Sequence, residues 1–402
     1  MDCLHYYCQG ESHKADNKVC QDFAYTSSEG GVTIAIVCDG HGGNRYFRSD
    51  IGAKYAAEIT AEAVKSFVKN TNRSLLENKP FTSVGPVSSQ DEGYKETVVD
   101  DAFRQLFAYI ISQWNIRISE HAVQNSVSEW EAEHVEQKYL DEFAAQHNLE
   151  KMYGCTLMAF VKAKRYWFAF HLGDGKCISL QPETIWAEPI PWDDRCFLNK
   201  TTSICDSDAL YEFRYCYQGD GQFPTAIFLG SDGIDDSFGE TTNMVNFYIQ
   251  LAKEIAKSEF EAKESLESTL PELSKIGSKD DMSVACAYDR HELKKLVPTL
   301  LDWQIEQVQN AIDSINEKIV ALTDKADRYA DMTISDNKTK IELQYVRSDL
   351  MRAETQKETL IRKINKLLQE KEGDCFVPYS EETQDSPQEE NASPIDTITE
   401  SD

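Results

Sequence analysis

The sequence predicts an α+β fold for its first three-quarters, followed by a helical extension. Two observations support this. Up to about residue 290, short apolar β-branched runs alternate with longer segments in which apolar residues recur at helical spacing. Beyond about residue 295, apolar residues recur three and four positions apart, as in helices that pack along a seam. We expect a domain over 1–293, a helical hairpin or coiled coil over 296–372, and an acidic disordered tail over 373–402.

Several strands and helices can be placed in order along the first domain. The run VTIAIVC, Val32–Cys38, predicts a buried strand that stops abruptly at Asp39. Residues 126–143 are rich in glutamate and would either extend a helix or form an insertion. We expect further helices over 45–69, 98–118 and 243–258, a strand hairpin over 154–172, and strands over 226–229 and 282–288.

The helical extension carries two runs of heptad-like spacing, separated by a polar break at 331–337 that suits a turn. A single lysine interrupts the apolar seam of the second run. The seam positions are Ile305, Val308, Ile312, Ile315, Ile319 and Leu322, then Leu343, Val346, Leu350, Ala353, Lys357, Leu360, Ile364 and Leu367. A short connection favours an antiparallel hairpin, and we expect it to mediate self-association or bind a protein partner.

Composition excludes several classes of protein. The formal net charge of -28 argues against binding to nucleic acids or anionic membranes, which are held mainly by lysine and arginine. Eleven cysteines without a CxxC pair are typical of reduced thiols, so we expect a cytoplasmic protein. We expect neither a signal peptide nor a membrane span, because no basic segment leads into an apolar run and no long apolar stretch occurs.

Four aspartates have the same surroundings in the sequence: each stands at the end of a short apolar strand and has a glycine or a second aspartate next to it. They are Asp39, Asp174, Asp232 and Asp280. A strand end holds a side chain on a rigid element and leaves it open to solvent. Carboxylates brought together repel one another, and a divalent cation relieves this repulsion. Oxygen ligands suit Mg²⁺ or Mn²⁺, which polarise phosphoryl oxygens and activate water.

Five motifs resemble, in the same order, those of the metal-dependent Ser/Thr protein phosphatases of the protein phosphatase 2C type. Together they cover roughly residues 10 to 290, and the segment 10–22 looks like a bacterial-type branch of that family. The motifs are DGHGG at 39–43, GCT at 154–156, LGDG at 172–175, SDGIDD at 231–236 and GSKDDMSV at 277–284.

The resemblance implies a four-layer α-β-β-α sandwich, with a central antiparallel β-sandwich and the metals in a cleft at one end. It also implies hydrolysis of phosphoserine and phosphothreonine in phosphoproteins by a metal-activated water, with two Mn²⁺ or Mg²⁺ ions and a weaker third. By position, Asp39 would bridge two ions and Gly40 would offer its carbonyl to one of them. Asp232 and Asp280 would hold the other ion, and Asp22 would lie nearby, acting through water.

The same resemblance assigns the remaining roles. Asp174 with Asp236 would fit the weaker third ion. His41 would be the general acid, because the alkoxide of serine or threonine is a poor leaving group that needs a proton. Lys18 and Lys14 stand near the position where many relatives carry a phosphate-binding arginine, and lysine binds phosphate as a point charge only.

Two departures from the family pattern keep a second function open. Gln21 replaces a common glutamate, and the phosphate-binding arginine is absent. The alternative is a catalytically weak or silent phosphatase-like protein that acts as a binding module or scaffold through its helical extension.

Overall fold

The computed structural model describes residues 1–87, 94–196, 200–331 and 337–373. The chain divides into two compact units, Met1–Leu300 and Leu301–Asp402. The sequence-based boundaries at 293 and 296 stay predictions, and the predicted tail lies outside the described residues except for Gly373.

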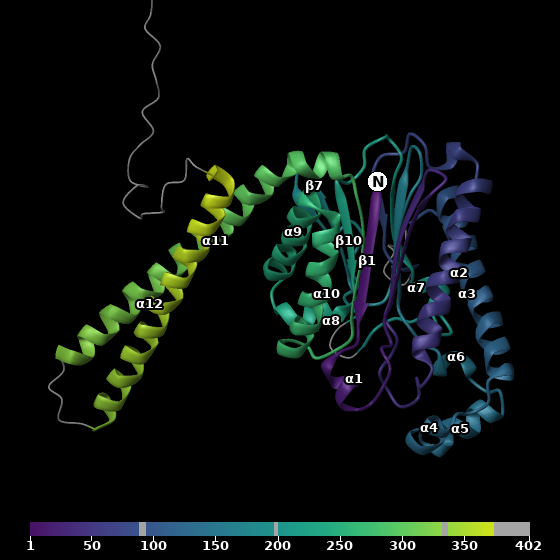
Figure 1. Cartoon of the computed structure of the whole chain (residues 1–402), viewed down its shortest axis with the longest axis horizontal. Helices are drawn as coiled ribbons and strands as arrows, with labels where there is room; N and C mark the ends of the chain where they lie inside the picture. Colours follow the sequence, from purple (N-terminus) through teal and green to yellow (C-terminus); the bar gives the residue numbers. More distant parts are fainter. Residues whose placement is uncertain (88–93, 197–199, 332–336, 374–402) are drawn as a thin grey trace, which may run out of the picture. The chain divides into compact units, whose positions relative to one another are not determined.

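Two antiparallel sheets form the centre of the first unit (Figure 1). One has five strands in the order β1-β11-β10-β7-β8, and the other has six in the order β2-β3-β5-β6-β9-β4. The strands of the first sheet are β1 (Asp2–Cys8), β7 (Lys176–Gln181), β8 (Ile185–Ala187), β10 (Ala226–Gly230) and β11 (Met282–Tyr288). Those of the second are β2 (Phe23–Glu29), β3 (Val32–Cys38), β4 (Thr82–Val84), β5 (Leu157–Lys162), β6 (Trp167–Leu172) and β9 (Arg214–Gln218).

A pair of long helices covers the outer face of each sheet (Figure 1). Helices α2 (Ser49–Asn70) and α3 (Val98–Gln124) lie on the six-stranded sheet, and α9 (Thr241–Lys257) and α10 (Glu259–Ile276) lie on the five-stranded sheet. The result is the α-β-β-α sandwich that the sequence motifs predict. The shorter helices of this unit are α1 (Glu11–Ala15), η1 (Arg73–Leu75), α4 (Glu129–His134), α5 (Gln137–Ala144), α6 (Leu149–Met152), α7 (Ala209–Glu212) and α8 (Asp232–Phe238).

Strand β3 shows why this core is rigid. Ile34 and Ile36 pack in the apolar layer beneath α2 and α3, whereas Ala35 and Val37 pack in the layer between the two sheets. All four side chains are at most 2% exposed. A strand buried on both faces reads as a continuous apolar run, and its end is held firmly in place.

Most of the expected elements are confirmed. The strand at Val32–Cys38, the β5–β6 hairpin and the strands β10 and β11 lie where the apolar runs place them. Helix α2 begins at Ser49 rather than at residue 45, because the preceding residues form a turn. Residues 126–143 do not extend α3, which ends at Gln124; they form a separate segment that contains α4 and most of α5.

Two long helices dominate the second unit, as the heptad pattern predicts. Helix α11 (Arg290–Asp331) starts in the first unit and continues into the second, where α12 (Asn337–Glu372) follows it. Asp302 near one end of this pair contacts Lys371, and Tyr329 near the other end bonds to Glu342, so the helices are antiparallel (Figure 1). Seam residues such as Ile312, Ala353 and Ile364 are buried.

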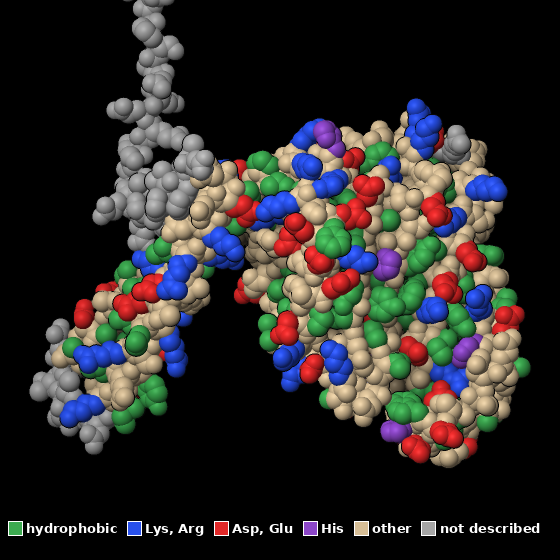
Figure 2. All heavy atoms as spheres, in the orientation of Figure 1, with side chains coloured by type: hydrophobic (Ala, Val, Ile, Leu, Met, Phe, Trp, Pro, Cys, Tyr) green, Lys and Arg blue, Asp and Glu red, His purple; other side chains and the backbone are tan. Residues whose placement is uncertain are grey.

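The surface of the described chain carries charges of both signs. On the visible face of the first unit, acidic and basic side chains alternate without a large patch of either sign (Figure 2). None of the described helices combines the length and the apolar character that a bilayer crossing requires.

Candidate metal and phosphate site

The four aspartates predicted at strand ends lie at one edge of the sandwich. Asp39 follows β3, Asp174 follows β6, and Asp232 follows β10 by two residues. Asp280 precedes β11, whose Val284 pairs with Gly230 at the end of β10. Pairing within each sheet and the packing of the two sheets against each other bring segments that are more than 200 residues apart to the same edge.

A cleft of about 750 Å³ opens at this edge. Its walls include seven of the ten site residues predicted from the sequence: Lys18, Asp39, Gly40, His41, Asp174, Asp232 and Asp280. Asp22 is 4% exposed and lies beside these carboxylates without lining the cleft. Asp236 also lies outside the lining, close enough for its charge to act on Asp174. Lys14 does not line the cleft, and its Nζ lies 3.7 Å from a carboxylate oxygen of Glu11.

Backbone contacts fix the position of Asp39. Its N–H donates to the Thr156 hydroxyl at 3.0 Å, and the Thr156 N–H donates to the Asp39 carbonyl at 2.8 Å. At the next residue, a side chain on Gly40 would lie 2.5 Å from the Gln21 carbonyl. This close approach allows only glycine, which explains the first glycine of the DGHGG motif.

The carboxylates at the cleft are buried close together and oppose one another's ionisation. Burial raises the pKa of Asp39 well above its usual range, and the charges of Asp22 and Asp232 raise it further. Burial likewise raises the pKa of Asp232 to about 7, with Asp174 and Asp280 adding to the effect. The carboxyl groups of Asp39 and Asp232 lie within hydrogen-bonding reach of each other, so each opposes full ionisation of the pair.

The donor set fits a divalent cation. Among the described residues, no three His, Cys, Asp or Glu side chains stand ready to hold an ion in this arrangement. A hard divalent ion bound among these carboxylates would relieve the repulsion among their oxygens.

Asp281 joins the N-terminal segment to the end of the last motif. It accepts hydrogen bonds from the backbone of Gly10 at 2.6 Å and of Gln21 at 2.5 Å, and its other contact is His13 Nδ1 at 2.8 Å. Burial alone would raise the pKa of Asp281, but these bonds outweigh it and lower the pKa. Asp281 and His13 therefore support the site structurally, a role that the sequence pattern did not reveal.

Hydroxyl groups from distant segments complete the surroundings of the predicted residues. Ser283 donates to Asp22 at 2.7 Å, and Thr201 bonds to Asp174. His41 Nε2 lies 2.7 Å from the Ser203 hydroxyl, which in turn donates to the Cys155 carbonyl at 3.0 Å. Because Ser203 gives its proton to that carbonyl, it accepts from His41, which then carries its proton on Nε2.

The imidazole of His41 is largely neutral in this environment. Its pKa is lowered to about 4, chiefly by burial; the charge of Asp206 opposes this shift and the charge of Lys151 adds to it. Lys18 lies at the cleft with its Nζ 3.8 Å from Asp16 and with 35% of its side chain exposed. Lys200 also lines the cleft, so two lysines are placed to meet an anion there.

A buried arginine behind the cleft is a second residue that the motifs did not indicate. Arg214 on β9 is fully buried and donates to the Gly173 carbonyl, and its guanidinium lies 2.8 Å from His171 Nδ1. It therefore holds the turn that carries Asp174, and its charge acts to lower the pKa of Asp174. No short motif surrounds Arg214, so only the strand pairing reveals its position.

Comparison with known proteins identifies the family of this chain. A family profile described as Protein phosphatase 2C matches residues 9–271. Similar solved structures include a C. elegans sex determining protein (14% identity over 74% of this chain and 67% of the other, TM-score 0.43). Another is PppA of Pseudomonas aeruginosa, with 13% identity over 71% of this chain and 96% of the other and a TM-score of 0.39. A third is the catalytic domain of the phosphatase PstP with two manganese ions, with 15% identity over 71% of this chain and 96% of the other and a TM-score of 0.39. No curated protein sequence matches the chain.

Proposed function

Because the chain belongs to the protein phosphatase 2C family, we propose that it hydrolyses phosphoserine and phosphothreonine in proteins, using two Mn²⁺ or Mg²⁺ ions. One observation carries this proposal: four aspartates from separate strand ends line one cleft, where burial and their mutual charges oppose their ionisation. Bound ions would neutralise phosphoryl oxygens and supply an activated water.

In this proposal the cleft carboxylates divide the ligand roles. Asp39 serves both ions, Gly40 offers its carbonyl to one of them, and Asp232 and Asp280 hold the other. Asp22 acts through water, as its buried position beside Asp39 allows. The proximity of Asp174 and Asp236, whose charges act on each other, supports a weaker third site there.

The other cleft residues handle the substrate. Lys18 neutralises part of the phosphate charge at the cleft, whereas the exposed Lys14 does not line the cleft and is the weaker candidate. His41, in its imidazolium form, donates a proton to the leaving oxygen of serine or threonine. A phosphate dianion beside His41 favours the imidazolium form and opposes the effect of burial on its pKa.

Hydrolysis of a phosphoserine peptide in the presence of Mn²⁺ or Mg²⁺ tests this function. We expect turnover that a chelator abolishes, and a loss of about a hundredfold or more in Asp39→Asn, because that side chain serves both ions. Asp101→Asn, which changes an exposed carboxylate in the first turn of α3, should keep full activity. Equal activity of Asp39→Asn and the unaltered chain would refute the two-metal assignment.

The alternative function is a phosphatase-like protein that binds phosphoproteins without turning them over. Gln21 favours it, because the amide removes one carboxylate beside the cleft and instead donates to Ser49 at 2.5 Å. Tight phosphopeptide binding without hydrolysis under any metal would support this function over the first.

We also propose a cytoplasmic location and a partner-binding or self-associating role for 296–372. Every cysteine within the described ranges is a free thiol, which fits a reducing compartment.

A further inference from the structure

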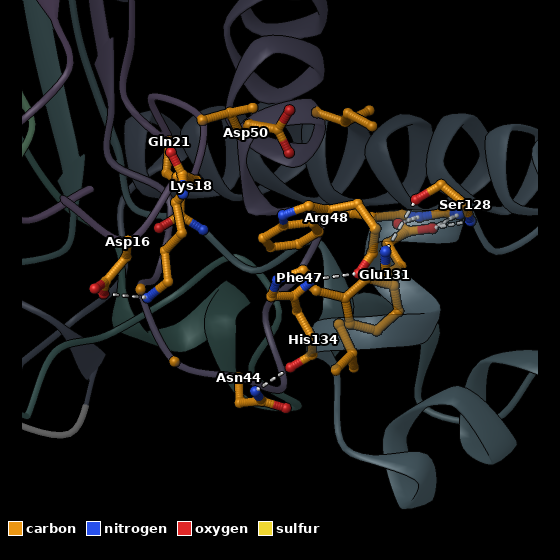
Figure 3. Close-up of a pocket in the computed structure, with 17 residues that line it drawn as sticks. Asp16, Lys18, Gln21, Asn44, Phe47, Arg48, Asp50, Ser128, Glu131 and His134 are labelled. Carbon is orange, nitrogen blue, oxygen red and sulfur yellow. Dashed lines mark hydrogen bonds and ion pairs between the residues drawn. The ribbon is translucent and has the colours of Figure 1, made fainter. Parts of the chain in front are cut away.

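A second pocket lies beside the phosphatase cleft. It has a volume of about 570 Å³ and shares Asp16, Lys18, Gly42 and Gly43 with the cleft, so the two are continuous. Figure 3 shows Asp16, Lys18 and Gln21 along one side and Phe47, Arg48 and Glu131 along the other. Its apolar walls are formed by Val19, Phe47, Ile51, Trp130 and Val135.

One wall of this pocket is built by a buried ion pair. Both carboxylate oxygens of Glu131 accept from Arg48, at 2.6 and 3.0 Å, and neither side chain is more than 9% exposed. The Arg48 guanidinium also lies 4.3 Å from the centre of the Phe143 ring. The pair fastens α4 to the start of α2, and its two charges cancel each other.

Asp50 is the one lining carboxylate whose charge is not neutralised in this way. It lies in the first turn of α2, beside Arg48, whose guanidinium is already paired with Glu131. Asp16 has Lys18 at 3.8 Å, whereas Asp50 forms no ion pair within the part of the chain that the structure describes. Figure 3 shows the Asp50 carboxylate next to the space between Lys18 and Arg48.

We propose that this pocket binds a lysine or arginine side chain of the phosphoprotein substrate, close to the phosphorylated residue. This inference rests on the proposed function, since the adjoining cleft must take the phosphate. The alkyl stem of the basic residue packs against Phe47 and Trp130, and its charged head pairs with Asp50. A wholly apolar residue would instead remove Asp50 from water without a partner, which costs free energy.

Peptides that differ only in charge test this assignment. Phosphoserine peptides carry lysine or its uncharged analogue norleucine at each of the three positions on either side of the phosphoserine. We expect one position at which lysine raises kcat/KM about fivefold, as for a partly buried ion pair. Asp50→Asn should abolish this ratio, and Asp50→Glu should restore most of it, while Asp101→Asn leaves it unchanged. Thermal unfolding of each variant establishes that α2 is intact.

The outcomes separate this inference from the proposed function. Suppose the protein hydrolyses p-nitrophenyl phosphate. If it then shows no preference for lysine peptides, or a preference that persists in Asp50→Asn, the basic-residue pocket is refuted and the proposed function stands. If no phosphatase activity occurs, fluorescence anisotropy with the same labelled peptides measures the lysine-to-norleucine ratio of affinities directly. A ratio near one then refutes the pocket, and a ratio that depends on Asp50 supports it although the chain is not a phosphatase.

Discussion

The environment of His41 favours its neutral form, whereas its proposed role as a proton donor requires the protonated form. Burial lowers its pKa to about 4, so the free protein carries a neutral imidazole at neutral pH. That form already places a proton on Nε2, toward Ser203, and the dianionic phosphate of the substrate is what would favour full protonation.

A comparison of leaving groups tests the proton-donor role. We expect His41→Ala to lower kcat for a phosphoserine peptide about a hundredfold or more, because a serine alkoxide leaves poorly without a proton. Hydrolysis of p-nitrophenyl phosphate should change far less, since nitrophenolate leaves unaided. His147→Ala, at an exposed position, is the control. An equal loss on both substrates would assign His41 to structure or metal support.

Single residues differ in how far the sequence could predict them. Asp39, Asp232 and Asp280 stand in short local patterns next to strands, and all three line the cleft. The partners that position such groups come from far along the chain, as Ser203 does for His41 and Gly10 does for Asp281. Local patterns carry no information about these pairings, which depend on strand register.

At the level of elements, the segment between α3 and β5 gains its order from one buried ion pair. Glu131 sits in a capping box with Ser128 at the start of α4 while it holds Arg48. Burial would raise the pKa of Glu131, but the bonds from Arg48 and Ser128 outweigh it, so the pKa is lowered.

Glu131→Gln should therefore destabilise the protein in a pH-dependent way. Breaking one side of a buried pair costs about 3 kcal/mol in the free energy of unfolding at pH 7. A carboxylate with a lowered folded-state pKa stabilises the protein above its unfolded value of 4.5, and this contribution disappears as the pH falls through the folded value. Urea denaturation at pH 7 and near pH 3.5 should show a difference that shrinks on acidification.

The matched control is Glu142→Gln. Glu142 pairs with Arg45 at 3.0 Å, but both side chains are about one-third exposed. We expect this substitution to cost less than about 1 kcal/mol at either pH. A similar cost for both substitutions would mean that the Arg48–Glu131 pair does not organise the segment.

Elements with strong periodicity were predictable, and those with mixed patterns were not. The continuous apolar run of β3 and the heptad seams of α11 and α12 identify their structures unambiguously. Strands β1, β2 and β9 were not predicted, because tyrosines, serines and charged residues interrupt their apolar positions. Their places follow from pairing with β11, β3 and β6, which is non-local.

At the scale of the whole molecule, the net charge of -28 has a consequence for the substrate. A chain with this net charge repels acidic phosphoproteins at a distance and attracts basic segments, in line with a pocket for a lysine or arginine beside the cleft. The preference for lysine peptides should therefore weaken as ionic strength rises, because salt screens such charges.

The helical hairpin of the second unit leaves apolar side chains on its surface. Val320 on α11 and Ile341 and Tyr345 on α12 are more than half exposed, with Ile341 and Tyr345 one turn apart. Two helices that share one narrow seam bury little surface, and exposed apolar residues on such an element typically mark a contact surface.

We expect this surface to mediate self-association or the binding of a protein partner. Light scattering should show the unaltered chain as an oligomer, or as a monomer that gains mass with its partner, and the double change Ile341→Glu and Tyr345→Glu should remove that association. Gln356→Glu, at an exposed position of the same helix, should have no effect. Phosphopeptide hydrolysis should be equal in all three proteins, because every residue proposed for the chemistry lies before residue 300.

The association role would be contradicted if the unaltered chain is a monomer and the double variant binds the same partners. A loss of activity in the double variant would instead make the hairpin part of the catalytic machinery.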